Sequence, residues 1–125
     1  MALLALMLAG LAAPPPASAS VASRRAAAYR CNAGARHWTP SEARCAVRVI
    51  WHGSRRIAQA LRVAACESHF NAYRVEPGSH ASGVWQIIPA YHRDIARYVF
   101  DPVRSSEWVR QVTRDGRNWS AWVCQ

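Results

Sequence analysis

Glu67 is the residue whose chemical type and position most strongly indicate a reactive site. It lies at the end of a mainly apolar stretch and is followed directly by Ser68. Sixteen positions later, Gly83 begins a short apolar segment that contains a single amide side chain, Gln86. A carboxyl group beside an apolar surface can hold a proton and donate it to the leaving oxygen of a glycosidic bond. These residues predict a sugar-cleaving site with Glu67 as the proton donor.

The segment that carries Glu67 has the pattern of an amphipathic helix. Ile57, Leu61 and Ala64 recur at helical spacing, and Ser54 is a residue type that can cap the start of such a helix. On this helix Glu67 falls on the last turn, at the edge of the apolar stripe rather than at its centre. That position suits a side chain that lines a groove.

A capping box predicts a second helix over residues 39–53. Thr39 is a good N-cap, Pro40 suits the first helical position, and Glu42 stands at the third. Gly53 is a suitable residue to end the helix.

Two more helices are expected in the second half of the chain, over residues 89–99 and 101–116. The second of these begins with Asp101 as the cap and Pro102 at the first helical position. Residues 72–88 are expected to form a loop or a small β element. The fold class predicted is therefore mainly α-helical (α+β).

The length of 125 residues supports one domain. Residues 1–19 combine an apolar run, three consecutive prolines and an Ala-Ser-Ala sequence, which is typical of a signal peptide. Residues 20–38 show no clear periodicity and are expected to form an N-terminal tail. Residues 39–125 are expected to form the folded domain of an exported protein.

Four cysteines in a small exported chain predict two disulfides, for which three connectivities are possible. Proximity in the sequence favours Cys31–Cys45 with Cys66–Cys124. No Cys-x-x-Cys or His-Glu-x-x-His sequence is present. Neither a metal site nor another cofactor is therefore expected.

The formal net charge is +9, and every cationic side chain other than histidine is an arginine. A basic exported protein is attracted to polyanions, and bacterial cell walls are polyanionic. No nucleic-acid-binding signature is present, so nucleic acid is not an expected partner. We expect a monomer with no stable membrane insertion once the leader is removed.

Two linked segments resemble the catalytic signature of the soluble lytic transglycosylases. They are residues 67–71 (Glu-Ser-His-Phe-Asn) and residues 82–89 (Ser-Gly-Val-Trp-Gln-Ile-Ile-Pro). That family shares a lysozyme-like fold with goose-type lysozymes. The Cys-Glu-Ser sequence and residues 119–124 (Trp-Ser-Ala-Trp-Val-Cys) are also similar to the actinobacterial resuscitation-promoting factors. The resemblance covers about residues 43–124 and implies a lysozyme-like domain.

The resemblance also implies roles for individual residues. Glu67 matches the single catalytic acid and base of the family. Ser68 matches a serine that orients the carboxyl group or contacts the sugar near its N-acetyl group. Gln86 matches a glutamine that lines the groove, and Gly83 matches a glycine that lets the backbone approach the sugar through a positive φ or close packing.

This chain departs from the family pattern at three further places in the predicted site. His69 stands where a small residue is usual, so it is expected to form the groove wall beside Glu67. Trp85 replaces an aliphatic residue or methionine and is expected to bind substrate. The family's Ala-Tyr-Asn-x-Gly sequence is absent, which leaves Tyr91 and Tyr98 as candidates for the tyrosine that supports the acid; Tyr91 is also expected to bind substrate.

The tryptophans near the two segments and in the C-terminal tail have two possible roles. The indoles of Trp85, Trp119 and Trp122 can stack on sugar rings or pack in the core. The other three tryptophans are expected in the core. A Cys66–Cys124 disulfide would let the tail close over the groove.

The predicted reaction is cleavage of the bond between N-acetylmuramic acid and N-acetylglucosamine in peptidoglycan, by an enzyme secreted to the cell wall. Glu67 would protonate the leaving oxygen and then accept a proton from the 6-hydroxyl, which gives a 1,6-anhydro product. A hydrolase ordinarily needs a second carboxylate, and Glu76 is the only one close to the two segments in sequence. A hydrolytic muramidase and a non-catalytic wall-binding module remain the alternatives.

Overall fold

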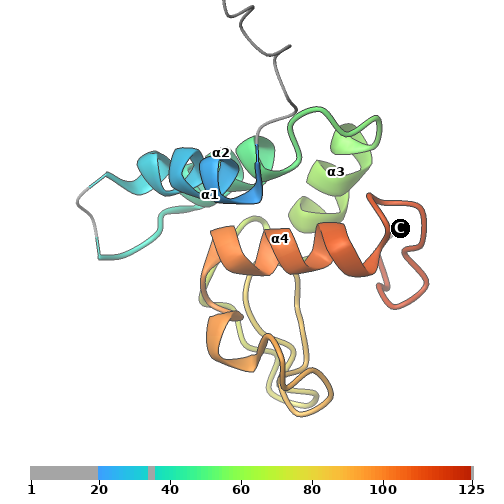
Figure 1. The fold of residues 1–125 in the computed structure, drawn as a ribbon. Helices are drawn as coiled ribbons and strands as arrows, with labels where there is room; N and C mark the ends of the chain where they lie inside the picture. The colour runs from blue at the N-terminus through green and yellow to red at the C-terminus, as the bar shows by residue number, and fades with distance from the viewer. Residues whose placement is uncertain (1–19, 34–35, 125) are drawn as a thin grey trace, which may run out of the picture.

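The computed structural model describes residues 20–33 and 36–124. The predicted signal peptide, residues 1–19, lies outside these residues. The described chain contains four α-helices: α1 (Val21–Tyr29), α2 (Pro40–Ile50), α3 (Ile57–Ser68) and α4 (Pro102–Val112) (Figure 1). Single 3-10 turns, η1 (Arg30–Asn32) and η2 (Ala96–Tyr98), complete the regular structure. The protein is mainly α-helical, and none of its described helices is long and apolar enough to cross a membrane.

Helix α1 corrects the expectation of an unstructured N-terminal tail over residues 20–38. Its N-cap, Ser20, accepts a hydrogen bond from the backbone N–H of Ser23 at 3.1 Å, and Ala28 is fully buried. The helix packs against α2 and α4, and Arg25 forms a bidentate ion pair with Glu107 of α4. Alanine and arginine both favour helix, so packing and propensity agree here even though no apolar stripe is visible.

Helix α2 begins with the predicted capping box. The Thr39 hydroxyl accepts from the backbone N–H of Glu42 at 3.2 Å, and the Glu42 carboxylate accepts from the N–H of Thr39 at 2.9 Å. The helix ends at Ile50, three residues earlier than expected. Gly53 instead occupies a turn at φ +83°.

Helix α3 buries a face close to the predicted one. Its fully buried side chains are Ala60, Val63, Ala64 and Ser68, whereas Ile57 and Leu61 are partly buried against the core. Ser54 does not cap the helix: its hydroxyl accepts from the N–H of Arg56 in the preceding turn.

The chain between α3 and α4 has little regular structure. The β element expected near residues 72–88 is reduced to two isolated bridges, Val75 with Ser82 and Ser82 with Ile87. The helix expected over residues 89–99 is absent. Successive i→i+3 hydrogen bonds form separate turns there, and only η2 is a helical turn. The predicted start of α4 is confirmed, because the Asp101 carboxylate accepts from two backbone N–H groups in the first turn.

Four indoles form the centre of the core where these segments meet. The rings of Trp51, Trp85 and Trp119 lie 5.6–6.2 Å apart, and Trp122 packs edge-on against Trp119 at 5.6 Å. Trp51 and Trp85 are fully buried. The cluster joins the end of α2, the loop before η2 and the C-terminal tail.

Gly83 is required by the path of the chain through this core. It has φ +78°, and a Cβ atom built on it would lie 1.9 Å from the carbonyl oxygen of Val99. Because that oxygen belongs to the backbone, the contact can be relieved only by moving the chain around residues 83 and 99.

We predict that Gly83→Ala lowers the free energy of unfolding by roughly 3 kcal/mol, since it combines a backbone clash with a strained φ. Gly78→Ala is the matched control, because nothing lies within 4 Å of its added Cβ. It should change stability by less than about 1 kcal/mol. Urea unfolding of both variants measures the difference, and equal losses would contradict the role assigned to Gly83.

The capping box generates a prediction about pH. Hydrogen bonds from Thr39 lower the pKa of Glu42. A lowered folded-state pKa stabilises the fold at neutral pH, and this stabilisation is lost as the pH falls through that lowered value. Glu42→Gln keeps the acceptor but removes the charge. The wild type should therefore exceed the variant in stability at pH 7, and the excess should shrink toward pH 3 in urea unfolding; parallel pH profiles would contradict this.

Candidate active site

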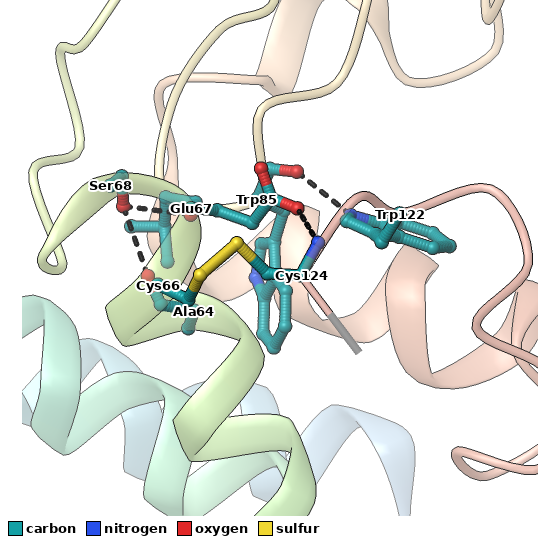
Figure 2. Close-up of a disulfide and its surroundings, with 8 residues drawn as sticks. Ala64, Cys66, Glu67, Ser68, Trp85, Trp122 and Cys124 are labelled. Carbon is teal, nitrogen blue, oxygen red and sulfur yellow. Dashed lines mark hydrogen bonds between the residues drawn. A yellow bond between two sulfur atoms is a disulfide. The ribbon is translucent and has the colours of Figure 1, made fainter.

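Glu67 is held at the end of α3 by contacts from the C-terminal tail. Its side chain is half-buried, and its Oε1 atom accepts a hydrogen bond from the backbone N–H of Cys124 at 3.2 Å. The neighbouring Cys66 forms a disulfide with the same Cys124 (Figure 2). One oxygen of the carboxyl group is thus fixed by a residue that is itself covalently tied to the helix.

The other carboxyl oxygen, Oε2, is available for chemistry. It makes no hydrogen bond with any residue that the structure describes, and Glu67 forms no ion pair with a described arginine. An adjacent guanidinium would favour the ionised form and oppose proton donation. The surroundings of Glu67 are therefore compatible with a role as proton donor.

The tail reaches the predicted second segment through Trp122. Its indole N–H donates to the backbone carbonyl of Trp85 at 2.8 Å, as Figure 2 shows. Residues 119–124 are consequently fixed at two points, one on α3 and one on residues 82–89. The tail brings the two sequence segments of the predicted site together.

Ser68 makes a second link between the same two segments. Only 2% of its surface is exposed, and its hydroxyl contacts the carbonyl oxygens of Ala64 at 3.3 Å and Val84 at 2.8 Å. The expectation that Ser68 touches the sugar is therefore wrong, since its hydroxyl is buried and directed at the backbone. Its role is to hold the end of α3 against residues 82–89.

Gly83 and Trp85 are also placed differently from a direct substrate contact. Both are buried, and the Trp85 indole N–H donates to Ser106 at 2.9 Å inside the core. The expectation that Trp85 binds substrate is wrong because its ring has no exposed surface. The positive φ and close packing predicted for Gly83 are present, but they serve contacts within the protein.

Gln86 lies at the edge of an open groove. Its side-chain N–H group donates to the carbonyl oxygens of Arg74 at 3.2 Å and Gly83 at 3.0 Å, which fixes the amide. Its amide oxygen is left available to a ligand. The groove has a volume of about 490 Å³, and its lining includes Gln86, Tyr91, Asp94, Trp108, Asn118 and Trp122.

Glu67 itself does not line this groove. The tail connects the two: Cys124 donates its backbone N–H to the carboxyl group, and Trp122, two residues earlier, lines the groove. A volume of this size accommodates a small oligosaccharide fragment, and the wall offers both rings and polar groups.

Sequence reasoning missed three residues of the groove wall. The Trp108 indole N–H donates to Asp94 at 2.8 Å, and the ring of His92 lies edge-on to Trp108 at 4.9 Å. Trp108 was expected in the core, and residues 92 and 94 fell in a helix that does not form. The run of polar residues that follows Pro89 in the sequence was the signal that could have indicated a groove wall here.

Of the remaining predicted residues, His69 and Tyr91 are exposed, whereas Tyr98 is half-buried against the core. His69 is exposed and ends α3 in the left-handed conformation, with φ +52°. Tyr91 is 78% exposed at the rim of the groove, and Tyr98 packs beneath Arg104, with the guanidinium carbon 4.2 Å from the ring centroid. Neither tyrosine hydrogen-bonds Glu67 in the described structure. The backbone amide of Cys124 makes that contact.

Comparisons with protein-family models, with curated proteins and with solved structures found no match. The resemblance of residues 67–71 and 82–89 to lytic transglycosylases therefore stays a prediction from the sequence. The candidate site rests on the geometry around Glu67.

The two disulfides, Cys31–Cys45 and Cys66–Cys124, have the connectivity favoured by the sequence and span 14 and 58 residues. Removing them by alanine substitution should cost about 3 and about 4 kcal/mol of unfolding free energy. Only the Cys66→Ala/Cys124→Ala variant should also speed hydrogen exchange at the backbone amide of residue 124. The Cys31→Ala/Cys45→Ala variant is the control for the global loss of stability; if the two variants speed exchange at this amide equally, the tail is not held by its own disulfide.

Proposed function

We propose that this protein is a peptidoglycan lytic transglycosylase with Glu67 as its single acid and base. The observation that carries the proposal is the state of the Glu67 carboxyl group. One of its oxygens is fixed by the N–H of Cys124, and the other makes no hydrogen bond with a residue that the structure describes; the tail that holds the carboxyl group also contributes Trp122 to the groove. A positioned, half-buried carboxyl group beside a saccharide-sized groove is what glycosidic proton donation requires.

In the proposed reaction, Oε2 of Glu67 donates a proton to the oxygen that joins the two sugars. The bond from that oxygen to C1 of N-acetylmuramic acid breaks, and the N-acetylglucosamine leaves with a free hydroxyl. The carboxylate then takes the proton of the 6-hydroxyl on the remaining sugar. The 6-oxygen bonds to C1, which gives the 1,6-anhydro product without consuming water.

The proposal includes a lysozyme-like fold and export to the cell wall. The helical architecture and the placement of Glu67 at the end of a helix support the first. Two disulfides, typical of oxidising compartments, and the net charge of +9 support the second. The expected form is a monomer that acts on glycan strands.

A hydrolytic muramidase is the second candidate, and Asp94 favours it. This carboxylate lines the groove and is held by the Trp108 indole, so a second acid is present on the groove wall. An enzyme that activates water uses such a carboxylate as its base or nucleophile. The reaction products distinguish the two candidates.

Glu67→Gln should lower the rate of muropeptide release from purified peptidoglycan by roughly 10²–10⁴-fold, because it removes the proton donor and keeps the shape of the side chain. Glu76→Gln is the control, since Glu76 is exposed and, among the described residues, its carboxylate pairs with Arg74 alone. That variant should keep the wild-type rate within about twofold. Mass spectrometry should find anhydro-muropeptides from the wild type.

Three outcomes would change the assignment. Full activity of Glu67→Gln would remove Glu67 from the reaction. Reducing-end products alone, together with inactivity of Asp94→Asn, would identify a hydrolase. Binding to cell walls without any loss of turbidity would identify a non-catalytic binding module.

A further inference from the structure

A second cavity lies on the other side of α4, and its lining is rich in arginine. It has a volume of about 580 Å³ and is formed by α1, the end of α2 and the end of α4. We call it the arginine cleft; it is lined by Val21, Arg24, Arg25, Ile50, Glu107, Arg110, Gln111, Arg114 and Asp115. The lining of the arginine cleft thus contains four arginines and two carboxylates.

Both carboxylates of the cleft are neutralised by their own arginine partners. Arg25 donates to both oxygens of Glu107, with N···O distances of 2.8–3.2 Å, and this pairing raises the pKa of Arg25. Arg110 donates to Asp115 at 2.9 Å. Arg110 also donates to the carbonyl oxygen of Ile50 at 2.6 Å, which locks its guanidinium in place. The Arg25–Glu107 and Arg110–Asp115 pairs therefore contribute little net charge to the cleft.

Arg24 and Arg114 are left without a partner in the described structure. Neither guanidinium makes a hydrogen bond, ion pair or ring contact. They come from different elements, one from α1 and the other from the turn that follows α4. The cleft therefore contains two arginines that have no anionic partner among the described residues and that come from different elements. Its apolar lining includes Ile50.

We propose that the arginine cleft binds a phosphodiester polymer of sugars or polyols. Guanidinium groups bind the oxygens of phosphate in bidentate fashion, and two separate guanidinium groups fit a ligand whose charge repeats along a chain. The cleft is concave, so a chain can enter it and a flat membrane surface cannot. Its lining includes no aromatic ring on which a nucleic-acid base could stack.

This inference does not rest on glycosidic cleavage at Glu67. Helix α4 lies between the two cavities: Glu107, Arg110 and Gln111 face the arginine cleft, whereas Trp108 and Val112 face the groove. A ligand in one cavity leaves the other open. Binding in the cleft should therefore persist when the groove is inactive.

The test uses Arg24→Gln/Arg114→Gln and a control of equal charge, Arg44→Gln/Arg62→Gln, whose arginines are exposed and line neither cavity. Poly(glycerol phosphate) is titrated into each protein by calorimetry at several salt concentrations. The cleft variant should bind about tenfold more weakly. The plot of log K against log salt has a negative slope, and its magnitude should decrease by about 1.4, because each phosphate contact on a single chain contributes about 0.7. The control and Glu67→Gln should bind within twofold of the wild type.

Four results would overturn the proposal. They are no binding by the wild type, an equal loss in the control variant, equal affinity for polyglutamate of matched length, and tighter binding of an oligonucleotide of matched charge. The last would assign the cleft to nucleic acid. Circular dichroism and thermal unfolding check that the cleft variant is folded, which we expect because neither guanidinium makes a hydrogen bond, ion pair or ring contact with a described residue.

Discussion

The packing of four tryptophans holds together the parts of the molecule that have almost no regular hydrogen bonding. Trp51, Trp85, Trp119 and Trp122 come from three separate segments and meet in one cluster. Burying an indole contributes about 5 kcal/mol, whereas the unpaired N–H groups of Trp51 and Trp119 cost about 1–3 kcal/mol each. Packing therefore outweighs the loss of hydrogen bonds, and the loop between α3 and α4 takes its shape from side chains.

The position of Glu67 follows from that cluster. Trp119 and Trp122 hold the tail against the core, and the tail presents the N–H of Cys124 to the carboxyl group. A backbone N–H cannot titrate or change rotamer, so its position depends only on the path of the chain. The Cys66–Cys124 disulfide restricts that path from the other end. The tail thus makes the contact for which the resemblance implied a tyrosine.

Two local capping signals predicted helix starts correctly, whereas the cap expected at Ser54 and the helix end expected at Gly53 did not form. The caps at Thr39 and Asp101 form as expected because each needs only its own first helical turn. The helix Val21–Tyr29 was missed, since its stability comes from contacts with α2 and α4 that no short window contains. For the same reason Trp85 was assigned to the groove. Whether an indole faces solvent or the core is decided by segments distant in the sequence, here Trp51 and Trp119.

Helix α4 gives the two proposed sites different physical characters because its faces differ. The face with Trp108 and Val112 offers ring surfaces, whose contribution to binding is short-ranged and insensitive to salt. The face with Arg110 borders the charges of Arg24 and Arg114, which have no ion-pair partner among the described residues and act over about 8 Å at physiological ionic strength. Attraction to a polyanionic cell wall would thus depend on the charge of the arginine cleft and on the salt concentration. Recognition of the glycan would be governed by the groove, so retention and cleavage would respond to different substitutions.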